Sequence, residues 1–208
     1  MTITFPIVIP IDFVDQATFR EVNLTGFNDS IFTGSREKQA YEGGWWTVDV
    51  RWAELSAVEG EDLGAILSAL RGAEGTCTLI DFLNRAPRGE AATNPGTPSV
   101  NGAGQFGYTV DIKGGPSSVT NWLLRGSRIQ IGPDTRPRLY KVLTDVSTDI
   151  AGEATIDIWP ALKSPVLDSD PVVLTNPKLL LEMVENDMSF DIRAPELYRY
   201  RMQFRESF

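Results

Sequence analysis

Two segments of the chain alternate apolar and polar side chains at every position. Residues 198–205 place Arg199, Arg201 and Arg205 between apolar neighbours, and residues 45–52 repeat the pattern with Trp46, Val48, Val50 and Trp52 on one face. Alternation of this kind is typical of an extended strand with one packed face and one wet face. The chain is therefore predicted to be mainly β, with antiparallel strands that are half-buried.

The N-terminal part is expected to form an antiparallel meander. Residues 17–24 alternate loosely, and residues 31–41 are interpreted as a further strand before the one at 45–52. Turn chemistry is supplied between them by Asn28-Asp-Ser and by the pair Gly43-Gly44.

One α-helix is predicted after these strands. Ser56 and Glu59 have the spacing of a capping box, and Gly72 stands where a glycine would end the helix. The apolar positions follow the helical period, at Leu63, Ile66, Leu67 and Leu70. A buried strand is expected next, over residues 76–83.

The chain is predicted to contain two domains. Residues 85–115 are dense in Gly, Pro, Asn, Ser and Thr, which indicates a loop or a boundary. Short strands are expected beyond it at 127–132, 139–146 and 154–159, and later at 179–183 and 188–192. We interpret residues 85–164 as an inserted small β-barrel of OB-like type. The first domain is then discontinuous, made of residues 1–84 and 165–208, and is a β-sandwich or barrel with one flanking helix.

The composition argues against common catalytic chemistry. The chain has no histidine, which removes the usual general base and the commonest metal ligand. Its one cysteine, Cys77, lies in an apolar run and is expected to be a buried thiol. We therefore expect no catalytic residues, no cofactor and no metal site, and a protein that is not an enzyme. An acid-only hydrolase stays open as an alternative, since 28 acidic residues are present and two carboxylates suffice for such chemistry.

The charge and the N-terminal sequence bear on partners and location. A net charge of −9 disfavours binding to phosphate backbones, although an acidic channel would let DNA pass without adhering. The opening Met1-Thr-Ile-Thr-Phe lacks the basic region of a signal peptide, and no apolar stretch is long enough to cross a bilayer. We expect synthesis in the cytoplasm and no membrane insertion.

Two sets of residues are candidates for contact with partners. Arg199, Arg201 and Arg205 form one face of a predicted strand, either an intersubunit salt-bridge row or a solvated edge. Within the inserted barrel, Trp122, Tyr140 and Trp159 form a possible docking or glycan-binding surface, with core packing as the alternative.

Several motifs together resemble the distal tail proteins of long-tailed, siphovirus-type bacteriophages and of gene transfer agents. They span residues 32–162 and are Phe32-Thr-Gly-Ser, Tyr41-Glu-Gly-Gly-Trp-Trp-Thr-Val-Asp-Val, Leu70-Arg-Gly, Leu83-Asn-Arg-Ala-Pro-Arg-Gly, Val100-Asn-Gly-Ala-Gly-Gln-Phe-Gly, Leu139-Tyr-Lys-Val and Gly152-Glu-Ala-Thr-Ile-Asp-Ile-Trp-Pro-Ala-Leu. The resemblance implies a first domain of tail-tube type and an outward-facing small barrel.

The same resemblance implies a structural role in the virion, at the phage tail tip. Copies of the chain would form a hexameric ring that joins the tail tube protein to the baseplate hub protein, contacts other tail-tip or fibre proteins, and leaves a lumen for DNA. Two alternatives stay open: another tail tube, terminator or minor tail subunit, and a glycan-binding tail module.

Overall fold

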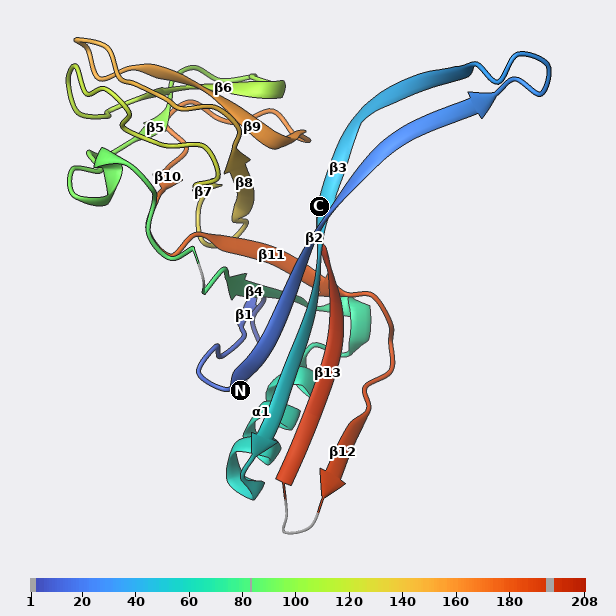
Figure 1. The fold of residues 1–208 in the computed structure, drawn as a ribbon. Coiled ribbons are helices and arrows are strands. Elements are labelled where there is room, and N and C mark those ends of the chain that lie inside the picture. Colours follow the sequence, from blue (N-terminus) through green and yellow to red (C-terminus); the bar gives the residue numbers. More distant parts are fainter. Residues whose placement is uncertain (1–2, 83, 194–196) are drawn as a thin grey trace.

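The computed structural model describes residues 3–82, 84–193 and 197–208, and these fold into two β-sheets (Figure 1). The first sheet follows the order β1-β4-β11-β13-β3-β2, with β12 paired to β13. Only the contact between β1 and β4 is parallel among the described pairings of this sheet. Its strands are β1 (Ile7–Val8), β2 (Val14–Asp29), β3 (Arg36–Leu55), β4 (Thr76–Ile80), β11 (Lys178–Met183), β12 (Phe190–Arg193) and β13 (Leu197–Glu206).

The second sheet is antiparallel and follows the order β10-β7-β8-β9-β6-β5. A bridge between Ser99 and Pro171 brings its two edges together, so the sheet is nearly closed and barrel-like. Its strands are β5 (Ser99–Val100), β6 (Gly107–Lys113), β7 (Arg128–Ile131), β8 (Arg138–Val142), β9 (Ala154–Leu162) and β10 (Val172–Val173). The protein is mainly β, as predicted.

The inserted unit differs from the expectation in one internal strand and in its C-terminal limit. β6 lies inside the glycine-rich segment 85–115, where the composition predicts a loop, because alternate residues there, Val110 and Ile112, are fully buried. The second sheet also continues past residue 164 to β10, and the apolar core of this sheet includes Val166, Val172 and Leu174. The strand β10 has only two residues, which is too short for an alternating pattern to predict it.

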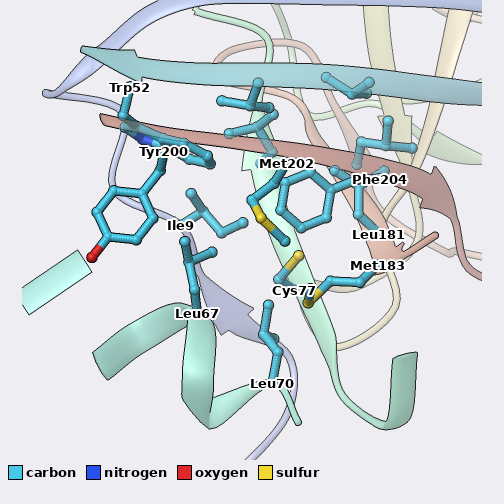
Figure 2. Packing of buried hydrophobic residues seen from close by; sticks show 14 of the residues in the cluster. Ile9, Trp52, Leu67, Leu70, Cys77, Leu181, Met183, Tyr200, Met202 and Phe204 are labelled. Atoms are coloured by element: carbon cyan, nitrogen blue, oxygen red, sulfur yellow. The ribbon is translucent and has the colours of Figure 1, made fainter. Parts of the chain in front are cut away.

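The core of the first sheet confirms the alternation seen in the sequence. Trp46, Val48, Val50 and Trp52 of β3 are 0% exposed, so the whole apolar face of this strand is covered. Figure 2 shows Tyr200, Met202 and Phe204 of β13 turned toward Leu67, Leu70 and Cys77, which fill the space between sheet and helix. The polar residues of both strands lie on the opposite face of the sheet.

The helix α1 (Ala57–Ala69) begins as predicted and ends slightly earlier. Ser56 and Glu59 form the capping box, with the Ser56 backbone N–H donating to the Glu59 carboxylate at 2.9 Å. At the other end, Leu70 is the C-cap and Arg71 takes the left-handed conformation, with φ of 55°, that was expected of Gly72. Gly72 has a positive φ as well, 70°, and opens a short 3₁₀ turn, Gly72–Glu74. A second such turn covers Glu90–Ala92.

The meander expected near the N-terminus is in fact a single long hairpin. The pair Gly43-Gly44 lies within β3 and is not a turn, so residues 36–41 and 45–52 belong to the same strand. A Cβ on Gly44 would lie 3.0 Å from the Val22 carbonyl oxygen and 3.2 Å from the Trp159 ring. Glycine is therefore favoured here by the close approach of the paired strand β2 and of β9 in the second sheet, and not by a reversal of the chain.

A buried polar junction joins the two sheets. The Trp46 indole N–H donates to the Leu139 carbonyl at 3.0 Å, from the first sheet to the second. The Arg128 guanidinium lies 4.6 Å from the centre of the Trp46 ring and 3.4 Å from the Asp81 carboxylate. Contacts of this kind hold the inserted unit against the sheet that carries it.

Candidate interaction surfaces

The distal half of the β2–β3 hairpin forms an arm, residues 23–41, that leaves the body of the protein (Figure 1). β13 pairs with β3 only from Thr47 onward, so beyond that point β2 is the one described strand neighbour of β3. Every residue of the arm is exposed or half-buried. A two-stranded ribbon of this length is marginally stable by itself, so its persistence needs further support.

The base of the arm receives that support from the second sheet. The Trp159 indole N–H donates to the Asn23 side-chain oxygen at 2.7 Å, and Lys141 donates to the Glu21 carboxylate at 2.8 Å. The two donors come from β9 and β8. The inserted unit therefore acts as a brace that sets the direction in which the arm leaves.

The tip of the arm is ordered by its own polar groups and presents apolar side chains. The Arg36 guanidinium donates to the Asp29 carboxylate at 2.6 Å, and this contact holds the pKa of Asp29 below its usual value. Between them, Ile31 and Phe32 are 95% and 97% exposed. Adjacent large apolar side chains on a projecting element are typical of a surface that another protein covers.

The three candidate arginines of β13 lie on one face, as predicted, but have different surroundings. Arg199 is 3.6 Å from the Glu54 carboxylate, and the Arg205 guanidinium lies 4.5 Å from the centre of the Trp45 ring. Arg201 is exposed and stands directly across from Arg51 of β3. Arg51 belongs to no motif of its own in the sequence, although its place in the alternating run 45–52 assigns it to this face.

The proposed glycan surface is wrong, because its three aromatic residues are buried. Trp122, Tyr140 and Trp159 are 0%, 4% and 8% exposed. The Trp122 indole donates to the Asn94 carbonyl at 3.2 Å, and the Trp159 ring packs edge-on against Trp46 with centroids 4.7 Å apart. Burial also raises the pKa of Tyr140. The free energy gained by burying their apolar rings exceeds the cost of burying their polar groups. None of the three therefore offers a free ring face to a sugar.

An exposed aromatic residue of the second sheet lies elsewhere, in the loop before β6. Phe106 is 75% exposed. The loop that carries it is fixed by Gln105, whose amide donates to the Asn101 carbonyl at 2.8 Å and accepts from the Asp111 N–H at 2.6 Å. Gly102 also donates to the Asp168 carboxylate at 2.9 Å. The glycine-rich segment here is therefore a surface loop that hydrogen bonds hold in place.

No group of metal-ligating side chains occurs among the described residues. Within the same part of the chain, no helix has the length and apolar character needed to span a membrane. No protein-family model matches the chain, and no curated protein matches it in sequence.

Proposed function

We propose that this chain is a non-enzymatic structural subunit of a long-tailed bacteriophage, which forms a ring at the distal end of the tail tube. The ring joins the tube protein to the baseplate hub and leaves a channel for DNA. Support comes from the sequence motifs over residues 32–162 and from a mainly β fold with one helix and an inserted, barrel-like sheet.

The observation that carries the proposal is the arm. A two-stranded element that projects from the body, with Ile31 and Phe32 almost wholly exposed, buries its apolar tip only against another chain. The brace from Trp159 and Lys141 fixes the direction of the arm before any partner arrives. Preorganisation lowers the entropy cost of association, which suits a subunit that assembles by repeated identical contacts.

Native mass spectrometry and electron microscopy of the full chain test the proposal. We expect hexameric rings, and we expect replacement of both Ile31 and Phe32 by serine to yield monomers. These should unfold cooperatively, at the melting temperature of the wild type diluted below its assembly concentration. Ile150→Ser is the matched control, because Ile150 is 84% exposed and belongs to the segment between β8 and β9, not to the arm. A chain that stays monomeric at all concentrations and is absent from purified virions would refute the proposal.

A second tail function, that of a tube, terminator or minor tail subunit, uses the same assembly chemistry. Position in the particle separates the two. Labelling of the chain in intact virions is expected at the tip of the tail, whereas a tube subunit would be labelled along its whole length.

A further inference from the structure

The outer, polar face of the first sheet carries a groove with a volume of 470 Å³. Its basic lining comes from three strands, with Arg20 on β2, Arg51 on β3, and Arg199 and Arg201 on β13. The acidic residues of the lining are Asp49 and Asp191. A groove with more cations than anions is unexpected on a chain of net charge −9. Arg20 pairs with Asp49 at 2.8 Å, so the net positive charge of the lining rests on Arg51, Arg199 and Arg201.

The centre of the groove holds an unfavourable pair. Arg201 and Arg51 face each other directly across β13 and β3, and like charges in that arrangement destabilise a sheet. The Asp15 carboxylate is 3.8 Å from Arg51, with both side chains about half exposed, so it offsets little of the repulsion. Arg201 forms no ion pair with any described residue. The contacts of Arg51 and Arg201 with other described residues therefore do not offset the repulsion between the two arginines.

A third arginine in the same groove also lacks an acceptor. The Nε of Arg199 is buried and has no hydrogen-bond partner among the described residues, while its terminal nitrogen is 3.6 Å from Glu54. A buried donor without an acceptor carries a desolvation cost. Because that Nε is buried, an outside partner can reach Arg199 only through its terminal nitrogens. The groove therefore presents Arg201, which has no ion pair among the described residues, beside Arg51 and Arg199, whose ion pairs are long at 3.8 Å and 3.6 Å.

From this arrangement we infer that the groove binds an acidic peptide segment of a partner protein, with carboxylates seated between Arg51, Arg199 and Arg201. The forked guanidinium matches the two oxygens of a carboxylate. The positive charge of the arginines favours an acidic segment over a neutral or basic one. Asp49 and Asp191 interrupt the row, and Glu185 and Asp187 line the hollow beside Arg201. A phosphate backbone carries a negative charge at every nucleotide, so some of its phosphates would lie against these four acids. A peptide can place its carboxylates beside the arginines and neutral residues beside the acids. The inference does not depend on ring formation.

A fluorescently labelled oligoglutamate peptide tests this directly, by anisotropy with the full chain. We expect saturable binding that weakens with added salt, because exposed charge pairs are screened. Arg201→Gln and Arg51→Gln are each expected to weaken binding about tenfold. Neither should lower the melting temperature, since each removes one member of a repelling pair. This combination separates a binding role from a structural one.

Arg136→Gln is the matched control, because Arg136 is exposed in a turn of the second sheet and its loss changes the net charge equally. Its affinity for the peptide should equal that of the wild type. Equal loss in the control would reveal non-specific attraction and overturn the inference. The inference would also be overturned if the peptide failed to bind, or if single-stranded DNA bound more tightly through the same arginines.

Discussion

The Lys163 ammonium lies 2.9 Å from the Glu206 carboxylate, across the junction between the two sheets. Glu206, at the end of β13, is 1% exposed and also accepts from the Trp46 backbone N–H at 3.1 Å. Lys163 follows β9 and lies 3.7 Å from the centre of the Phe208 ring. Arg138 of β8 donates to the Ser207 carbonyl. The last residues of the described chain therefore clasp the inserted unit to the first sheet.

Glu206→Gln should weaken this clasp. The variant keeps an acceptor for the Trp46 N–H and removes the charge that opposes Lys163. We expect a loss of about 2 kcal/mol in the free energy of unfolding near neutral pH, less than for a fully buried pair because 20% of the Lys163 side chain is exposed. Denaturant unfolding measures this loss. No loss would mean that the pair contributes nothing net to stability.

The effect of Glu206→Gln should also depend on pH. Burial lowers the pKa of Lys163 from 10.5 to about 8, although the Glu206 carboxylate opposes the change. Without that carboxylate the pKa of Lys163 falls further. At pH values between the pKa of Lys163 in the variant and that in the wild type, the folded wild type binds more protons than the folded variant. The stability difference therefore shrinks as pH rises through about 8.

A Lys163→Met background supplies the control. With the lysine absent, the cost of Glu206→Gln should lose its pH dependence in this range. A dependence that survives in that background would assign it to another group, such as Tyr140, whose pKa is raised by burial and by the Glu206 carboxylate.

Gly60→Ala should destabilise the protein, although alanine favours a helix by about 1 kcal/mol. A Cβ at this position would lie 2.4 Å from the Tyr198 ring, where β13 passes beneath α1. Overpacking against a rigid ring costs about 1–3 kcal/mol, so we expect a net loss in the free energy of unfolding. Ser68→Ala, on the exposed side of the same helix, should be neutral or slightly stabilising. A stabilised Gly60→Ala variant would contradict this packing.

Local patterns predicted much of the fold. The alternation in residues 45–52 and 198–205 identified the two central strands and their buried faces, because a period of two fixes which side of a strand is covered. The capping box of Ser56 and Glu59 placed the start of the helix, since both partners lie within one turn of the chain.

Features set by distant residues were not predictable in this way. Gly43-Gly44 has the composition of a turn. The reason for glycine at position 44 is the close approach of the Val22 carbonyl and of the Trp159 ring from the second sheet. Trp159 itself is held by Asn23, 136 residues away along the chain. Likewise, the groove depends on the register that sets Arg51 opposite Arg201, and no local pattern encodes that register.

Cys77 should be unreactive until the protein unfolds. Its thiol is 0% exposed, and burial raises its pKa from 9.0 to about 12. Because the thiolate is the reactive species, alkylation by iodoacetamide at mildly alkaline pH is expected to be negligible in buffer and rapid in denaturant, as mass spectrometry would report. The raised pKa also means that its contribution to stability is lost as pH rises above about 9. Fast labelling of the native protein would show that this core opens locally.

Trp122→Ala should act through stability and not through recognition of a sugar. Trp122 is fully buried in the core of the second sheet, and its indole donates to Asn94. Loss of the side chain should lower the free energy of unfolding by about 3–5 kcal/mol. Trp122→Phe keeps most of the ring volume and should lower the free energy of unfolding by less. Its Asn94 carbonyl loses the indole donor and would accept from water. Thermal unfolding of both variants measures the order. A Trp122→Ala variant with wild-type stability would contradict the packing described here and restore the residue as a surface candidate.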